Sequence, residues 1–185
     1  ILLSDHGDMM GDHWMIRKGP FHFEGLIRIP FIWSWPGRIQ QGVRVKSITG
    51  QIDFAPTVLD FCGTPIPEGE IPCEPEASLM RAPWPGRSLR QVIEGEEDKA
   101  REAIIVENDE DYLGLRVRTM VSEDYKITIY PGHEFGEIFD LKNDPLELHN
   151  LWASIDGTIK KELLRQFIEE YLEEEPALPR RMSHA

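Results

Sequence analysis

The stretch Ile1-Leu2-Leu3-Ser4-Asp5-His6-Gly7 decides how the fold is interpreted. Its apolar residues predict a short buried strand, and the polar residues that follow predict a loop. In α/β proteins, ligands bind at the carboxyl ends of strands. The stretch therefore indicates an α/β domain with a binding site directly after a strand. Because a natural chain rarely begins inside a core strand, we also expect further residues upstream of Ile1.

The composition restricts the class of protein. The chain has 185 residues, a formal net charge of -13, 41% hydrophobic residues and 29% charged residues, which is typical of a folded globular protein. The acidic balance argues against a nucleic-acid partner, since such binders usually carry a basic surface. No apolar stretch approaches the roughly 18 residues that a membrane span needs. The acidic composition is still compatible with an enzyme for anionic substrates, because a bound cation and a few basic side chains can reverse the local electric field.

Two further elements are predicted in the first half of the chain. Residues 31–35 (FIWSW) indicate a second buried strand. Residues 53–62 indicate a helix, because Asp53 can cap its first turn and Gly63 suits the position after its end. Residues 63–87 are rich in proline and glycine, so they predict a long loop.

The second half predicts an antiparallel meander packed on a helix. Strand-forming segments separated by acidic or glycine-containing turns occur at residues 103–107, 112–121, 125–130 and 137–141. Apolar residues at helical spacing follow Asp156 and predict a helix that packs on this meander. We therefore divide the chain into part of an α/β domain (1–90), a subdomain of meander and helix (91–175), and a polar tail (176–185).

Asp5 and His6 are candidate metal ligands. Adjacent residues of an extended strand point in opposite directions, so both can bind one ion only where the chain turns. Gly7 permits such a turn. Oxygen ligands suit Ca²⁺, Mg²⁺ or Mn²⁺, and an imidazole shifts the preference toward Mn²⁺, Fe²⁺ or Zn²⁺. Taken alone, an Asp-His-Gly sequence is more often only a turn.

The order of the surrounding motifs is specific. Residues 4–14 (SDHGDMMGDHW) are followed by Lys18, Glu24, Arg28-Ile29-Pro30 and Pro36-Gly37. Later segments extend the set, at residues 51–57, 85–89, 116–126 and 137–151. Together they resemble the sulfatase family of the alkaline phosphatase superfamily over residues 1 to about 152. The Asp-His-Gly form resembles the choline-sulfatase-like and phosphonate-monoester-hydrolase-like members of that family.

The resemblance implies a fold, a reaction and a set of site residues. The fold would be the C-terminal part of an alkaline-phosphatase-like α/β/α sandwich, with a small antiparallel sheet packed on a C-terminal helix. The substrate would be a small-molecule sulfate or phosphate ester. Asp5 and His6 would be two ligands of one divalent cation, Ca²⁺ or alternatively Mn²⁺. Lys18 would contact the oxygens of the ester anion and stabilise the charge of the transition state.

The resemblance is less specific about the neighbouring side chains. His13 is a candidate catalytic residue that either lies near the leaving group or only braces its loop. Glu24 and Arg28 are expected to form a structural pair. His22 and Trp14 are candidates for the lining of the substrate pocket.

The nucleophile of the family is missing from the matching positions. Sulfatases carry a Cys/Ser-x-Pro-x-Arg motif whose Cys or Ser becomes formylglycine. Residues 73–77 (CEPEA) lack the required Arg and follow the Asp-His-Gly turn instead of preceding it, so we reject Cys73 as the nucleophile and expect Cys62 to be a small buried residue. We therefore expect formylglycine in an upstream part and no useful activity from this chain alone. Exposed sheet edges would then favour self-association into a homo-oligomer.

Other functions stay open at this point. A phosphonate monoester or phosphodiester hydrolase of the same superfamily would use the same fold. A two-zinc phosphodiesterase would need further ligands, and His133 and His149 lack the required sequence context. A different class is a non-catalytic interaction module, in which the acidic runs at residues 107–111 and 169–175 contact a partner.

Overall fold

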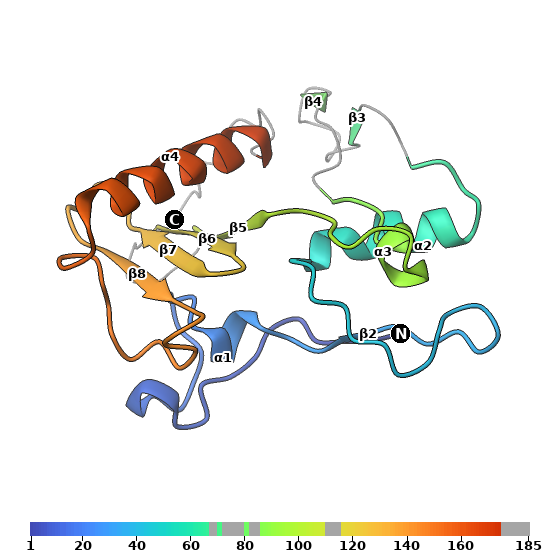
Figure 1. The fold of residues 1–185 in the computed structure, drawn as a ribbon, viewed down its shortest axis with the longest axis horizontal. Coiled ribbons are helices and arrows are strands. Elements are labelled where there is room, and N and C mark those ends of the chain that lie inside the picture. The colour runs from blue at the N-terminus through green and yellow to red at the C-terminus, as the bar shows by residue number, and fades with distance from the viewer. Residues whose placement is uncertain (67–69, 72–79, 82–85, 110–115, 175–185) are drawn as a thin grey trace, which may run out of the picture.

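The computed structural model describes residues 1–66, 70–71, 80–81, 86–109 and 116–174. Its largest element is a four-stranded antiparallel sheet in the order β5-β6-β7-β8 (Figure 1). The strands are β5 (Ala103–Asn108), β6 (Val117–Ser122), β7 (Tyr125–Ile129) and β8 (Gly136–Asp140). The predicted meander is therefore confirmed in the part of it that the structure describes.

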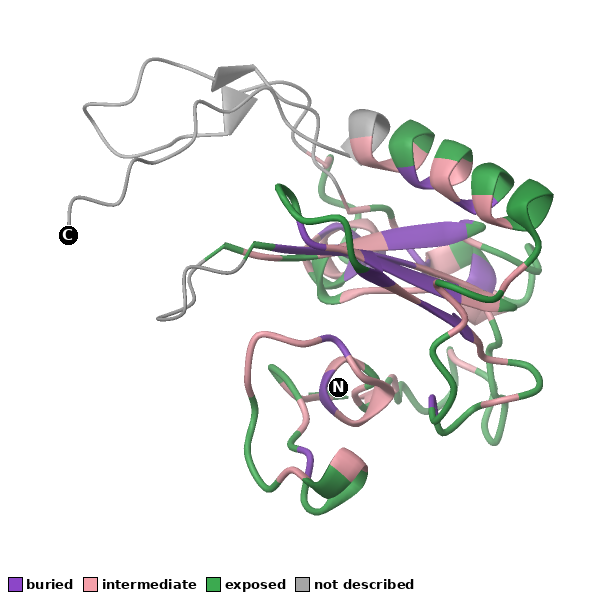
Figure 2. Ribbon diagram, turned by 90° about the vertical axis from the view of Figure 1, so that its left-hand side faces the viewer, coloured by how far each residue is buried: buried purple, intermediate pink, exposed green. Residues whose placement is uncertain are grey.

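Helix α4 (Gly157–Glu174) covers one face of this sheet. Asp156 begins the helix, because its Oδ1 accepts a hydrogen bond from the backbone N–H of Thr158 at 2.8 Å. Alternate strand residues point toward α4 and form the core with apolar residues of the helix. Figure 2 shows the buried layer between sheet and helix, whose buried members are Ala103, Met120, Ile127, Ile138, Leu163 and Phe167.

The opposite face of the sheet is covered by part of the N-terminal segment, which we define as residues 1–50. It contains β1 (Leu2–Leu3), the 3-10 turn η1 (Asp12–Trp14), α1 (Glu24–Ile27) and β2 (Phe31–Ile32). Figure 1 shows this blue chain on the side of the sheet away from α4. Most of the segment has no regular secondary structure, so its position depends on individual contacts.

The prediction that β1 and β2 are buried strands is wrong for this chain. The two strands pair with each other in antiparallel register, Leu2 opposite Ile32. Both side chains are 56% exposed. The reason is that the two strands form an isolated two-stranded ribbon within the described ranges, and no third strand pairs with them there.

A third group of elements surrounds the buried carboxylate of Asp53. Here η2 (Gln51–Asp53) leads into α2 (Phe54–Phe61), and α3 (Arg90–Glu94) packs beside it. Asp53 accepts hydrogen bonds from the backbone N–H groups of Gly50 and Arg87, both at 2.9 Å, and pairs with buried Arg101. One carboxylate therefore ties the helix start to the chain that enters β5.

Cys62 differs from the prediction that it is buried. Cys62 is exposed, because it follows the last residue of α2 at the turn where the helix ends. Cys73 lies outside the described residues.

Two short strands, β3 (Glu70–Ile71) and β4 (Met80–Arg81), pair within the stretch predicted to be a loop. Across the described ranges, no helix combines the length and apolar character that crossing a membrane requires.

Candidate functional site

Asp5, His6 and Lys18 lie together at the carboxyl end of β1. His6 Nε2 is 3.5 Å from Asp5 Oδ2 and 2.9 Å from Lys18 Nζ. The Asp5 and His6 side chains are 85% and 42% exposed, so they are open to a ligand. The backbone N–H of His6 donates to Asp5 Oδ1 at 2.9 Å. This bond and the nearby imidazole hold the pKa of the Asp5 carboxyl below its usual value.

Two contacts fix the turn that carries Asp5 and His6. The backbone N–H of Gly7 donates to the carbonyl of Leu26 at 2.7 Å. A Cβ atom at Gly7 would lie 2.0 Å from the carbonyl oxygen of Gly25, so only glycine allows this approach. On the other side, the Gln51 amide donates to the carbonyls of Ser4 and Asp5, at 2.7 and 2.5 Å.

The role of Gln51 was not predicted from the sequence. The residue directly precedes Ile52 and Asp53, whose buried carboxylate pairs with the Arg101 guanidinium. An exposed glutamine carries no pattern that identifies its partner. Its place at the start of the segment 51–57, which resembles a sulfatase motif, was the available signal.

Asp5 and His6 fit one part of a cation site. A carboxylate and an imidazole that converge within 3.5 Å are suitable donors for a divalent ion. Across the residues that the structure describes, no group of three or more His, Cys, Asp or Glu side chains is placed to hold a metal. Since such ions take about six or more ligands, further ligands would have to come from elsewhere.

His13 lies on a tight loop and contacts a different part of the molecule. Its ring stacks on Phe23 with 3.9 Å between the ring centroids. Three residues of this loop that are not glycine, Met10, His13 and Trp14, have positive φ angles of 48°, 48° and 62°, and such left-handed backbone costs free energy for these residue types. The Trp14 side chain is fully exposed. The catalytic role of His13 stays a prediction.

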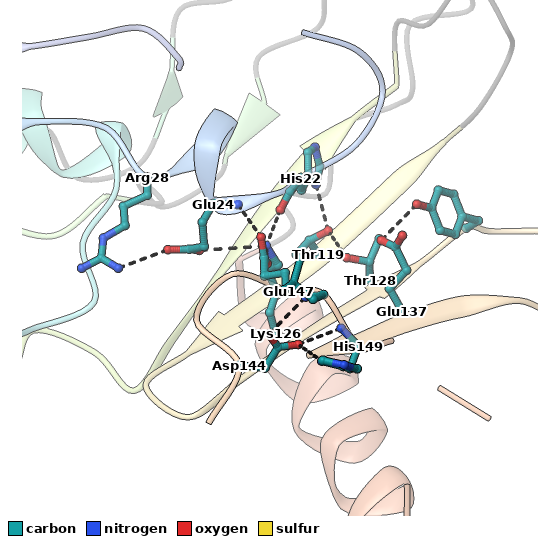
Figure 3. A network of polar contacts seen from close by, with 12 residues as sticks. His22, Glu24, Arg28, Thr119, Lys126, Thr128, Glu137, Asp144, Glu147 and His149 are labelled. Carbon is teal, nitrogen blue, oxygen red and sulfur yellow. Dashed lines mark hydrogen bonds and ion pairs between the residues drawn. The ribbon is translucent and has the colours of Figure 1, made fainter. Parts of the chain in front are cut away.

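A buried polar network joins the N-terminal segment to the sheet (Figure 3). Lys126 Nζ donates to the carbonyl of His22 at 2.6 Å, forms an ion pair with Glu147, and lies 4.0 Å from Glu24 Oε1. The carboxylate of Glu147 also accepts the backbone N–H of Glu24 at 2.7 Å. The predicted pair between Glu24 and Arg28 is present, with 3.4 Å between Oε2 and Nη1.

The ionisation of this network is shifted by its burial. Burial lowers the pKa of Lys126 to about 8, and the carboxylates of Glu24 and Glu137 oppose this shift. Burial, with the charges of Lys126 and Arg118, lowers the pKa of His22 to about 4. The His22 ring is thus neutral near pH 7 and shares a hydrogen bond with Thr119 Oγ1 at 2.8 Å, next to a second one between Thr119 and Thr128.

Known proteins with similar sequences are sulfatases. An N-acetylglucosamine-6-O-sulfatase of Bacteroides thetaiotaomicron is 29% identical over 92% of this chain and 29% of its own length. An arylsulfatase of Clostridium perfringens is 32% identical over 94% of this chain and 33% of its own. A choline-sulfatase of Rhizobium meliloti is 30% identical over 90% of this chain and 29% of its own. The chain thus spans about a third of the length of these relatives.

Solved structures share the fold. A protein in complex with its substrate D-glucosamine-2-N,6-O-disulfate superposes with a TM-score of 0.78 at 26% identity, over 98% of this chain and 35% of that one. A phosphonate monoester hydrolase of Silicibacter pomeroyi gives a TM-score of 0.74 at 21% identity, over 95% of this chain and 35% of that one. The expected fold, the C-terminal part of an alkaline-phosphatase-like α/β protein with a small antiparallel sheet and a C-terminal helix, is confirmed.

The family itself follows from a match that covers most of the chain. The family model described as N-sulphoglucosamine sulphohydrolase, C-terminal, matches residues 11–174. This range includes Lys18, α2, the four-stranded sheet and α4. The resemblance to sulfatases inferred from the motifs is therefore confirmed, and the chain belongs to the N-sulphoglucosamine sulphohydrolase C-terminal family of sulfatases.

Proposed function

We propose that this chain is the C-terminal part of a longer, metal-dependent sulfatase that hydrolyses sulfate monoesters. The observation that carries the proposal is the placement of Lys18 Nζ beside the Asp5-His6 pair, 2.9 Å from His6 Nε2. The relatives support it, because they are sulfatases about three times as long as this chain. On this proposal, the formylglycine nucleophile and the other metal ligands belong to the upstream part.

The three side chains have two roles in the proposal. Asp5 and His6 are two ligands of a single divalent cation, Ca²⁺ or alternatively Mn²⁺. When bound, such a cation polarises the oxygens of the ester and stabilises negative charge. Lys18 donates hydrogen bonds from its ammonium group to the oxygens of the sulfate, where charge develops in the transition state. With the cation bound, the ion and Lys18 would make the site locally positive in a chain of net charge -13.

His13 is proposed either to give a proton to the departing alcohol or to brace its loop. Its stacking on Phe23 at 3.9 Å supports the bracing role. A proton donor has to lie within hydrogen-bond distance of the leaving oxygen.

The second candidate is a phosphonate monoester or phosphodiester hydrolase of the same superfamily. The Asp5-His6-Gly7 sequence favours this candidate, because it resembles the form of the motif in phosphonate-monoester-hydrolase-like members of the family. Lys18 and the cation ligands would serve a phosphorus ester in the same way, because both anions present oxygens at similar positions. A two-zinc phosphodiesterase would differ in its metal content, with two ions per chain instead of one.

The deciding experiment uses the intact natural protein that contains residues 1–185. Its hydrolysis of an aryl sulfate, an aryl phosphate diester and an aryl phosphonate would be compared, with Lys18→Ala and Asp5→Ala beside it. We expect a preference for the sulfate and a loss of kcat/KM of about 100-fold or more in each variant. Lys142→Ala is the control, because Lys142 is exposed on the turn after β8.

The outcomes separate the candidates. Preference for the phosphonate or diester, with loss in both variants, would support the second candidate. Activity that survives both substitutions would contradict the proposed roles of Lys18 and Asp5. A metal-dependent turnover by the purified 185-residue chain, abolished by Asp5→Ala, would contradict the expectation that this chain needs an upstream part.

A further inference from the structure

Residues 22–27, which we call the anchor segment, are attached through residues 22–24 to the C-terminal sheet and to the turn after β8. The carbonyl of His22 accepts a hydrogen bond from Lys126 Nζ at 2.6 Å. The ring of Phe23 lies 6.0 Å from that of Phe139. The backbone N–H of Glu24 donates to Glu147 Oε2 at 2.7 Å. Side chains of the sheet and of the turn after β8 thus define where this backbone lies.

Lys126 and Glu147 are central to this attachment. The Lys126 side chain is only 1% exposed, and that of Glu147 is 2% exposed. A buried charge without a partner is strongly unfavourable. The two groups therefore have to remain paired, and each also forms one hydrogen bond with the backbone of the anchor segment.

Both halves of the candidate site are connected to the same anchor segment. Lys18 precedes His22 by four residues in the chain. The turn that carries Asp5 and His6 is fixed to the segment by the bond from Gly7 N–H to the Leu26 carbonyl, at 2.7 Å. A displacement of the segment would therefore move the lysine and the metal ligands together relative to the rest of the protein.

We infer that Lys126 and Glu147 are positioning residues for the anion-binding and metal-binding groups of the site. They act through the anchor segment and not by contact with the substrate. The inference rests on the proposed function for its catalytic consequence. A misplacement of about 1 Å far from the chemistry can reduce a rate by about 100-fold, so the C-terminal sheet determines the efficiency of a site that it does not contain.

The test variant is the double substitution Lys126→Met/Glu147→Gln in the intact natural protein. The single Lys126→Met variant would leave Glu147 buried and unpaired, and misfolding would then obscure the result. The double variant removes both charges. At position 147, where φ is 57°, glutamine is unbranched at Cβ like the glutamate that it replaces. The matched control is Lys99→Met/Glu123→Gln, which removes an exposed pair with 3.1 Å between Nζ and Oε2.

Three measurements decide the inference. We expect kcat for an aryl sulfate to fall by about 10-fold or more with a smaller change in KM, because Lys18 acts on the transition state. Adding Lys18→Ala to the double variant should then cost less than it does in the unmodified protein. Amide hydrogen exchange at residues 18–27 should rise, while amides of β6 and β7 stay protected. The control should leave all of these unchanged.

A folded double variant with kcat and KM within about twofold of the unmodified protein would overturn the inference. So would unchanged exchange at residues 18–27. If the unmodified protein hydrolyses none of the esters, the proposed function fails by itself. The exchange measurement then still decides whether Lys126 and Glu147 hold the anchor segment, because it does not depend on turnover.

Discussion

The C-terminal sheet and the N-terminal segment are held in place by different forces. In the sheet, Met120, Ile127 and Ile138 are completely buried between the strands and α4, and burial of such apolar area is the main source of stability. In the N-terminal segment, Leu2 and Ile32 are more than half exposed. Met9 and Leu26 of that segment are buried, but its attachment to the sheet and to the turn after β8 includes directional contacts of His22 and Glu24.

The difference matters because the candidate site lies on the less buried region. Asp5, His6 and Lys18 are on the N-terminal segment, while the rigid element is the sheet. A few directional contacts therefore connect a stable scaffold to the groups that would carry the chemistry. Such contacts specify geometry well but add little stability individually, with a typical hydrogen bond contributing about 1 kcal/mol.

The largest expected effect tests the packing difference directly. Ile127→Ala should lower the free energy of unfolding of the sheet by about 2–5 kcal/mol, since it opens a cavity in a fully buried position. Ile32→Ala, the same change on the exposed ribbon, should alter it by less than about 0.5 kcal/mol. Hydrogen exchange of the β6 and β7 amides measures both. Equal losses in the two variants would abolish the distinction between the regions.

The second effect concerns the buried polar network and is a loss of stability at acidic pH. His22 has a pKa of about 4 in the folded protein against an ordinary value of 6.5. Between these pH values the unfolded chain binds the proton and the folded one does not, so stability is fully present above pH 6.5 and decreases as the pH falls toward 4. The loss attributable to this group approaches roughly 3 kcal/mol.

His22→Asn sharpens that assignment, because asparagine retains a donor for Thr119 and does not titrate. The variant should show a shallower decrease of stability between pH 6.5 and 4, measured by urea unfolding at a series of pH values. His133→Asn is the control, since His133 is exposed. A slope identical to that of the unmodified protein would assign the acid sensitivity to other groups.

The smallest effect is local and concerns the site turn. Gly7→Ala would place a Cβ atom 2.0 Å from the Gly25 carbonyl oxygen, which should cost about 1–3 kcal/mol through forced displacement. The rate of amide hydrogen exchange should rise at residues 5–8 and 25–27, while the amides of β6 and β7 should stay protected. Gly157→Ala is the matched control, because nothing lies within 4 Å of its added Cβ. Loss of protection throughout the sheet would show that the two regions are not separable.

The sequence predicted regular elements better than it predicted their environment. Strands β5 to β8 were predicted from strand-forming segments separated by turns, and helix α4 from apolar residues at helical spacing. In β7, Lys126 stands between Tyr125 and Ile127 as a charged residue, which predicts exposure to solvent. The residue is buried instead, because a segment about a hundred residues earlier in the chain covers it.

The candidate site was inferred from the resemblance of its motifs to those of sulfatases and not from its contacts. The structure places Lys18 Nζ 2.9 Å from His6 Nε2. The supporting contacts of Gln51 and Glu147 were not predicted, because each is a single polar residue whose partner is distant in sequence. Long-range pairing of this kind leaves no periodic signal.

The backbone of Glu147 has a consequence for which substitutions this position tolerates. Its φ of 57° is a conformation that glycine adopts most easily. Its carboxylate, however, is needed by both Lys126 and the Glu24 backbone. Backbone and side chain therefore favour different amino acids, and each single substitution satisfies at most one of the two requirements. A library of variants at this position should be depleted of nearly every alternative, although the residue lies in a turn, where sequences usually vary freely.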